Sequence, residues 1–439
     1  MFAPDGTRSR NLRRPYSTLN EIYSVKLWKD VFPMTTKDKV VLAYSGGLDT
    51  SVCVKWLQTE MNLDVIAICG NVGQDEQDLE AIKKKALSLG AIDSEAVDLR
   101  DEYADHYLTK TIAANGLYEN TYPLLSALSR PLLAQKMVEV AHKFGAKYIA
   151  HGCTGKGNDQ VRFENSIKAL DPSIDILAPV RGWNLLTRED EMAYAKANGV
   201  PVAATVESPY SIDDNLWGRA IECGVLEDLN NEPPSDVWTL TVDPEDASDE
   251  AEYVELGFEA GKPISLNGEE LSLLDLIIEL NKIAGKHGYG RLDMVENRLV
   301  GVKSRECYEV PAGSAIILAH KALETVTLDR ETMHAKLDLE HLWSQCVYYG
   351  QWYSPLKTAL DAFMADTQKF VTGTVRMKFY KGNCTVVGRQ SPYSLYDFDL
   401  ATYGEGDTFD RSYSEGFMYI NGLQNTTWAR IQGPSAHQN

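Results

Sequence analysis

Hydroxyl, glycine and carboxylate residues follow one another between residues 43 and 51. The segment Ala43-Tyr44-Ser45-Gly46-Gly47-Leu48-Asp49-Thr50-Ser51 comes directly after an apolar run and directly before a helical pattern. Two adjacent glycines let backbone N–H groups approach an anion, and the start of a helix adds N–H groups that have no acceptor of their own. We therefore expect a phosphate or pyrophosphate here, with Ser45, Thr50 and Ser51 donating hydroxyls. A tight turn alone would explain the Gly-Gly pair but not the polar side chains around it.

A second polar segment follows a later apolar run. It reads His151-Gly152-Cys153-Thr154-Gly155-Lys156-Gly157-Asn158-Asp159-Gln160-Val161-Arg162-Phe163-Glu164. Thr154 and Asn158 can donate hydrogen bonds, Asp159 can accept from an ammonium, and Arg162 can bind a carboxylate through two bonds. Because α/β folds bind ligands at the carboxyl ends of parallel strands, the segment predicts a site for amino-acid head groups. Taken alone, it would also fit an exposed polar turn.

The elements that position these segments follow an α/β pattern. Short continuous apolar runs alternate with amphipathic stretches, which is typical of parallel strands covered by helices on both faces. The runs are 40–44, 65–69, 148–150 and 176–180. We expect a doubly wound parallel-sheet nucleotide-binding domain over residues 34–205.

Local signals predict where several helices of this domain begin and end. One helix should stop before Gly90, and another should begin with Pro131 at its first position. Thr187 with Asp190 three residues later predicts a capping box, in a helix that closes at Gly199.

The remaining chain divides into three further parts. Residues 206–398 predict an α+β synthetase domain with a half-buried strand at 237–242, an acidic loop at 243–252, turns at 261–262 and 267–268, and a helix at 271–283. Residues 399–439 are aromatic and sparsely charged, so we expect an oligomerisation tail that docks on another subunit. Residues 1–33 are weakly basic and are expected to be a poorly ordered leader, with translation starting at Met34.

Composition excludes several classes of protein. The chain has 439 residues, 44% of them hydrophobic, and a net charge of −20, which disfavours nucleic acid as a partner. Its seven cysteines include no CxxC pair, which favours reduced thiols in the cytoplasm over a zinc or disulfide framework. No run of 18 apolar residues is present, so no membrane span is expected.

The first segment resembles a known phosphate loop. It is neither a Walker A loop nor a GxGxxG dinucleotide loop. It is similar to the SGGxDS loop of the N-type ATP pyrophosphatase superfamily, whose members cleave ATP between its α and β phosphates. That resemblance implies ATP and Mg²⁺, with Asp49 near the metal-bound pyrophosphate and no confident direct protein ligand to the metal.

Together the two segments resemble the argininosuccinate synthase family. Further matches run in the same order over roughly residues 38–425, namely 117–124, 129–131, 208–216, 222–224, 285–288, 295–298, 303–305, 308–313 and 391–396. The resemblance implies ligation of L-citrulline and L-aspartate to argininosuccinate, with ATP converted to AMP and pyrophosphate through citrullyl-AMP. It also implies a homotetramer and a role in arginine biosynthesis.

The resemblance carries site residues over position by position. ATP is expected at residues 43–51, Gly70 and Gly152. Aspartate is expected at Thr154, Asn158 and Asp159. Citrulline is expected at Tyr122, Asn158, Arg162, Ser211, Glu296 and Tyr308. No residue has the features of a strong general base. We expect positioning to suffice, because holding two substrates against an activated phosphate supplies much of the barrier reduction.

Two positions depart from the family pattern. Ala127 and Ala220 stand where the family often has serine. Three interpretations stay open: Ser126 substitutes, only backbone contacts to citrulline remain, or citrulline binds more weakly.

Two alternative functions are weighed against the ligase. Another ATP pyrophosphatase, such as a tRNA thiolase, would need a basic surface and catalytic cysteines, which the net charge and scattered thiols disfavour. A nucleotide-binding sensor without ligase activity would bind ATP and show no citrulline-dependent turnover.

Overall fold

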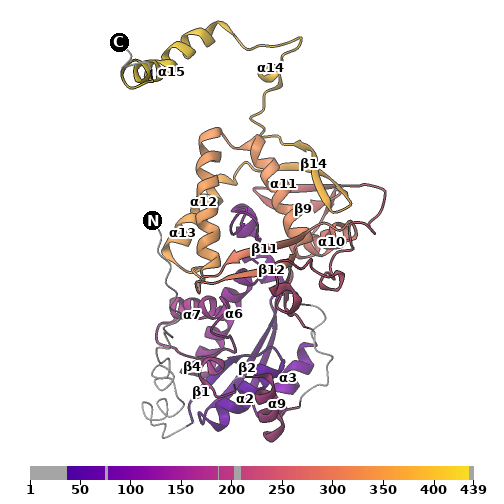
Figure 1. Ribbon diagram of the computed structural model, residues 1–439, viewed down its shortest axis with the longest axis vertical. Coiled ribbons are helices and arrows are strands. Elements are labelled where there is room, and N and C mark those ends of the chain that lie inside the picture. The colour runs from indigo at the N-terminus through magenta and orange to yellow at the C-terminus, as the bar shows by residue number, and fades with distance from the viewer. Residues whose placement is uncertain (1–36, 75–77, 186, 202–208, 435–439) are drawn as a thin grey trace, which may run out of the picture.

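The computed structural model describes residues 37–74, 78–185, 187–201 and 209–434 (Figure 1). Its N-terminal part is built on five parallel strands in the order β3-β2-β1-β4-β5. These strands are β1 (Lys39–Ala43), β2 (Asp64–Asn71), β3 (Asp93–Asp98), β4 (Tyr148–Ala150) and β5 (Asp175–Leu177). The predicted parallel sheet is confirmed. Its strand order reverses between β1 and β4, the place where such sheets bind ligands.

Helices cover both faces of this sheet, as the sequence predicts. Val40 and Leu42 of β1 pack on one side and Val41 on the other, because successive strand residues point to opposite faces. One face carries α2 (Leu48–Thr59), α3 (Leu79–Ser88), α8 (Pro179–Gly182) and α9 (Arg188–Ala197), and the other carries α6 (Leu125–Phe144) and α7 (Asp159–Leu170). A run of α4 (Arg100–Tyr103), the π-helix η2 (Ala104–Leu108) and α5 (Thr109–Ala113) follows β3.

The predicted helix ends that depend on local signals are confirmed. Thr187 and Asp190 form the capping box at the start of α9, where the Thr187 hydroxyl accepts from the Asp190 N–H at 3.2 Å. Gly90 and Gly199 follow their helices with φ of +97° and +68°, a conformation that favours glycine.

The predicted start of a helix at Pro131 is wrong. Helix α6 begins six residues earlier, at Leu125, and Pro131 lies inside it. An interior proline costs about 3 kcal/mol. Leu125 and Leu128 are fully buried in the turns before the proline, and burial of two leucines is worth about as much. Tertiary packing therefore overrides the local signal.

The predicted strand at 237–242 is also wrong. A 3₁₀ helix, η4 (Ser235–Val237), occupies its start, and no strand follows it in this described stretch. The N–H groups of Thr239, Leu240 and Thr241 instead donate to the buried carboxylate of Glu309, at 2.8–3.0 Å. The run predicted at 176–180 is shorter than expected, because Pro179 begins α8. The acidic stretch before β8 and the two glycine-containing turns are confirmed as irregular and turn structure.

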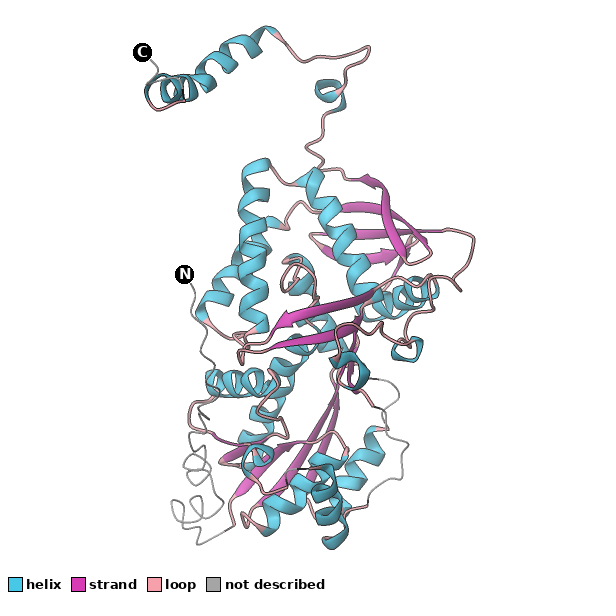
Figure 2. Cartoon of the chain, in the orientation of Figure 1, coloured by secondary structure: helices cyan, strands magenta, loops and turns pink. Residues whose placement is uncertain are grey.

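Two antiparallel sheets form the second part of the molecule (Figure 2). The four-stranded sheet has the order β11-β12-β7-β6 and the five-stranded sheet has the order β10-β9-β8-β13-β14. Their strands are β6 (Ser211–Asn215), β7 (Gly218–Glu222), β8 (Glu252–Glu259), β9 (Lys262–Leu266), β10 (Glu269–Glu270), β11 (Arg291–Asn297), β12 (Lys303–Glu309), β13 (Gly373–Tyr380) and β14 (Asn383–Gln390). The helices are η3 (Gly224–Glu227), α10 (Leu273–Lys286), α11 (Pro311–Thr327), α12 (Arg330–Tyr348) and α13 (Pro355–Thr367).

The largest hydrophobic core joins the two parts. It contains apolar residues from the stretch 99–132 as well as from 254–379. Within it, residues 114–124 enter the second part. The buried side chain of Asn115 donates to Glu324 and Glu340, at 2.6 Å each. The two parts therefore share one core despite their separate sheets.

The C-terminal region extends away from the body of the molecule (Figures 1 and 2). It contains α14 (Phe398–Ala401) and α15 (Ser412–Ile431), and neither helix buries any residue. Phe417, Tyr419 and Ile420 of α15 are 65–72% exposed. Among the described residues, no helix is both long and apolar enough to cross a membrane. The predicted leader and the predicted boundary at 205/206 lie outside the described residues.

Candidate active site

The phosphate loop connects β1 to α2 at the reversal point of the sheet. Gly46 has a left-handed φ of +79°, and Gly47 caps α2 without any side-chain hydrogen bond to the helix. The first N–H groups of α2 are thus left for a ligand. The hydroxyls of Ser45 and Thr50 lie 3.1 Å apart, and Lys85 donates to the Gly46 carbonyl at 2.5 Å. This arrangement suits a polyphosphate.

A cavity of about 590 Å³ opens beside this loop. Its walls include the ends of β1, β2 and β4, residues from α6 and α7, and the strand β6 of the second part. Of the residues predicted to bind ATP, those lining it are Ala43, Tyr44, Ser45, Gly47, Leu48, Asp49, Thr50, Gly70 and Gly152. Ser51 lies behind the loop, fully buried, with its hydroxyl 3.2 Å from that of Tyr44. The two predicted polar segments therefore meet at one cavity.

An acidic pair lies at the start of α2. Asp49 is hydrogen-bonded to Glu191 of α9. The pKa of Glu191 is raised to about 7, mainly by burial and secondly by this contact with Asp49. Carboxylate oxygens are ligands of the kind that Mg²⁺ prefers. No group of three or more His, Cys, Asp or Glu suited to a metal occurs among the described residues. Asp49 and Glu191 therefore fit a magnesium ion that is held largely by phosphate oxygens.

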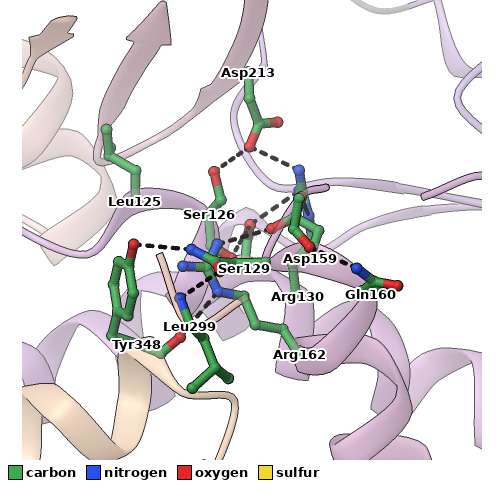
Figure 3. A network of polar contacts seen from close by, with 12 residues as sticks. Leu125, Ser126, Ser129, Arg130, Asp159, Gln160, Arg162, Asp213, Leu299 and Tyr348 are labelled. Carbon is green, nitrogen blue, oxygen red and sulfur yellow. Dashed lines mark hydrogen bonds and ion pairs between the residues drawn. The ribbon is translucent and has the colours of Figure 1, made fainter. Parts of the chain in front are cut away.

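Arg130 of α6 ties the cavity to the amino-acid segment (Figure 3). Its guanidinium donates to Asp159 at 2.8 Å and to Asp213 at 2.7 Å, while Asp159 also accepts from Arg162 at 2.8 Å. Burial alone would raise the pKa of Asp159, but Arg130 and Arg162 outweigh it and lower that pKa to about 2. Asp159 therefore remains a carboxylate that can accept from a substrate ammonium.

A second cluster of predicted residues lies next to this ion-pair network. The rings of Tyr122 and Tyr308 stack with centroids 4.2 Å apart, and the Tyr308 hydroxyl donates to Glu296 at 2.7 Å. Burial raises the pKa of Glu296, although two tyrosine hydroxyls that donate to it act in the opposite direction. Burial also keeps the Tyr308 hydroxyl protonated by raising its pKa well above the usual range. Neutral donors and one carboxylate thus converge beside Arg162.

Two predicted residues do not line the cavity. Thr154 and Ser211 are exposed, and neither side chain makes a hydrogen bond to any residue that the structure describes. Ala127 is fully buried in α6, and Ala220 pairs with both Asp213 and Tyr308 across the sheet. The Ser126 hydroxyl donates to Asp213, so its proton is already used in the structure. The interpretation that Ser126 substitutes for the missing serine hydroxyls is therefore the weakest of the three.

The comparisons with known proteins agree over residues 39–201 and 210–428. The family model described as "Arginosuccinate synthase N-terminal HUP domain" matches residues 39–201, and that described as "Arginosuccinate synthase C-terminal domain" matches residues 210–428. The chain belongs to the argininosuccinate synthase family.

Curated relatives carry the same family name. An argininosuccinate synthase of Oceanobacillus iheyensis is 53% identical over 399 residues, which cover 91% of this chain and 95% of the relative. Those of Symbiobacterium thermophilum and Streptococcus thermophilus are 54% identical, again over 91% of this chain and over 100% and 99% of the relatives. As a member of this family the chain is an ATP-using carbon–nitrogen ligase.

The sequence analysis did not point to Arg130, Glu191 or Tyr348, which the structure places with the predicted residues. Arg130 stands in a matched motif, Ser129-Arg130-Pro131, and that motif could have pointed to it. Tyr348, the last residue of α12, donates to Glu296 and accepts from Asn158. No motif marks it, because its role depends on a contact between residues 190 positions apart.

Proposed function

We propose that this chain joins L-citrulline to L-aspartate through citrullyl-AMP and releases AMP and pyrophosphate, as a step of arginine biosynthesis. One observation carries the assignment of both substrates to this site. Asp159 lines the cavity of the phosphate loop and is ion-paired to Arg162, which lies beside Glu296 and Tyr122. An adenylation site and an amino-acid site therefore share a wall, as a ligase of this kind requires.

ATP is assigned to the cavity beside the phosphate loop. Backbone N–H groups at residues 46–50 and the hydroxyls of Ser45 and Thr50 face its pyrophosphate portion. Gly70 forms part of the cavity wall without a side chain. A Cβ at this position would lie 2.5 Å from the side chain of Leu133. Donors already in place stabilise charge on a leaving pyrophosphate without rearranging during the reaction.

The amino-acid substrates are assigned to the two sides of Asp159. Aspartate is placed at Thr154, Asn158 and Asp159, where the carboxylate of Asp159 meets its ammonium. Citrulline is placed at Tyr122, Asn158, Arg162, Ser211, Glu296 and Tyr308, where Arg162 pairs with its carboxylate. Ala127 and Ala220 leave citrulline with backbone contacts only, or with weaker binding, at those two positions.

The reaction follows from this placement in two steps. The ureido oxygen of citrulline attacks the α-phosphorus of ATP, and the bond to pyrophosphate breaks. The ammonium of aspartate gives up one proton to water, and the free amine attacks the ureido carbon. The bond between that carbon and the oxygen of AMP then breaks, AMP leaves, and a second proton passes from the new C–N nitrogen to water. Adenylation turns a poor leaving oxygen into a phosphate ester, and fixed substrates supply the rest of the rate enhancement. Bound Mg²⁺ would neutralise phosphate charge there, with Asp49 and Glu191 as the side chains that would hold it.

We further propose a cytoplasmic homotetramer. An isolated helix with apolar residues such as Phe417, Ile420 and Trp428 exposed is unfavourable in water, and a second copy of this chain would cover it. Seven free cysteines suit a reducing compartment.

The test is pyrophosphate release from Mg-ATP with citrulline alone and then with aspartate, with product mass read by spectrometry. We expect release that requires citrulline, followed by a mass of argininosuccinate that requires aspartate. ATP binding without citrulline-dependent release would contradict the proposal and favour a nucleotide sensor. Release that depends on a different acceptor would favour another ATP pyrophosphatase.

A further inference from the structure

Asn158 is held in place from outside its own domain. It precedes α7 in the first part of the molecule and is 7% exposed. Its side-chain nitrogen donates to the hydroxyl of Tyr348 at 2.8 Å, and its side-chain oxygen accepts from the Leu299 N–H at 3.0 Å. Both partners belong to the second part, so the orientation of this amide depends on how the two parts meet.

Tyr348 extends the hydrogen bonds of Asn158 to Glu296, which belongs to the cluster of residues assigned to citrulline. Its hydroxyl accepts from Asn158 and donates its proton to Glu296 at 2.5 Å. A hydroxyl has one proton, so the direction of both bonds is fixed once Glu296 is ionised. The hydroxyl oxygen of Tyr348 thus links Asn158, which is assigned to both amino acids, to the carboxylate of Glu296, which is assigned to citrulline.

The ring of Tyr348 is fixed independently of its hydroxyl. It is fully buried and stacks on Tyr118 with ring centroids 3.6 Å apart. The centre of the Tyr348 ring lies 5.1 Å from the guanidinium carbon of Arg162, and Figure 3 shows both residues. The chain just after it passes so close to α7 that a Cβ on Gly350 would lie 2.8 Å from the Cα of Arg162. Removal of the hydroxyl alone should therefore leave the ring in place.

We propose that Tyr348 is a positioning residue that makes the aspartate and citrulline sites one unit by orienting Asn158 and Glu296 together. This inference rests on the proposed function. It adds that binding of citrulline and binding of aspartate depend on the same tyrosine hydroxyl. Binding of ATP, which is assigned to the phosphate loop, does not depend on it.

The test compares Tyr348→Phe with Tyr118→Phe. Tyr118 is the stacking partner, and its hydroxyl donates to a backbone carbonyl, that of Asn297, at 2.8 Å. We expect Tyr348→Phe to raise the KM for citrulline and the KM for aspartate about tenfold each, the usual effect of losing a hydrogen bond to a charged group. The KM for ATP should stay within twofold. Tyr118→Phe should leave all three within about twofold, with similar urea midpoints for both variants.

A second variant covers the case in which Tyr348→Phe is unstable. Leu299→Pro removes the other hydrogen bond to the Asn158 amide without altering Tyr348, and it should raise both amino-acid KM values and not that of ATP. The inference is overturned if the Tyr348 variant matches the Tyr118 control or if only one amino-acid KM rises. Wild type is assayed first, so absence of citrulline-dependent pyrophosphate release there would count against the proposed function instead.

Discussion

At the scale of single residues, the site works through charges that are balanced before substrate arrives. Asp159 has two arginine partners, and Arg130 has two carboxylate partners. Burial of such groups is tolerable only because each is paired and hydrogen-bonded. Removing one member would therefore take a counter-charge from each of its buried partners.

Replacing Asp49 or Arg162 by alanine should impair the reaction in different ways, the first through the rate of pyrophosphate release and the second through citrulline binding. Asp49→Ala should lower citrulline-dependent pyrophosphate release about a hundredfold, because charge on the leaving group loses its metal-side partner. Arg162→Ala should raise the KM for citrulline about tenfold or more, because a bidentate charged contact is lost. Steady-state kinetics with varied ATP and varied citrulline separates the two. Wild-type rates in either variant would refute that residue's assignment.

The pH dependence of stability should report the proton on Glu191. Its pKa rises from 4.5 to about 7 on folding, so the folded state holds a proton that the unfolded state releases between these values. Stability should therefore fall as pH rises through this window. Glu191→Gln should remove that fall and be more stable than wild type at pH 8.5 by about 1–2 kcal/mol, after allowance for partial exposure.

Urea unfolding at pH 5 and pH 8.5 without nucleotide measures this effect. Glu189→Gln, on an exposed position of the same helix, is the matched control and should keep the wild-type pH slope. An equal pH slope in wild type and Glu191→Gln would contradict the raised pKa of Glu191.

At the scale of elements, the segment 114–124 is held by a buried polar cluster. Asn115 has a left-handed φ of +45°, and its side-chain nitrogen donates to Glu324 and Glu340. Its side-chain oxygen lies 2.6 Å from Nδ1 of His320. Lys336 is paired with the same two glutamates. This cluster anchors the segment that carries Tyr122. It therefore connects α11 and α12 to the cluster of Tyr122, Tyr308 and Glu296.

Asn115→Ala should therefore be strongly destabilising. It leaves two buried carboxylates short of a donor, which should lower the free energy of unfolding by about 2–4 kcal/mol. Asn62→Ala is the control, because Asn62 also has a left-handed φ, +54°, but is exposed. It should cost about 1 kcal/mol for backbone conformation alone. Equal costs in urea denaturation would show that the cluster adds nothing.

Elements could be predicted from the sequence where their signals are local or follow a topological rule. The α9 capping box depends on residues three apart, and the phosphate loop and the 151–164 segment meet because parallel strands end at one edge. The failures have distant causes. The carboxylate of Glu309 takes the hydrogen bonds that a strand at 237–242 would need, and Tyr348 reaches the site from the far end of α12.

At the scale of the whole molecule, the C-terminal region that carries α15 is the part whose apolar side chains stay exposed in the single chain. Its helix α15 buries no residue. A chain that ends at Gly404 should form a smaller particle than the full chain, because the apolar helix that would dock on another subunit is gone. Size-exclusion chromatography with light scattering measures the number of chains per particle. An unchanged number after truncation would exclude the tail as an oligomerisation element.

The shared core also sets an order of events during synthesis. Residues around Leu132 leave the ribosome before residues around Phe379, which lie in the same core about 250 positions later. At about 5–20 residues per second the delay is roughly 12–50 s. During that time the apolar residues of the stretch 99–132 lack their core neighbours from the stretch 254–379. The nascent chain should therefore be a client of chaperones that bind apolar segments, until the last strand of the core emerges.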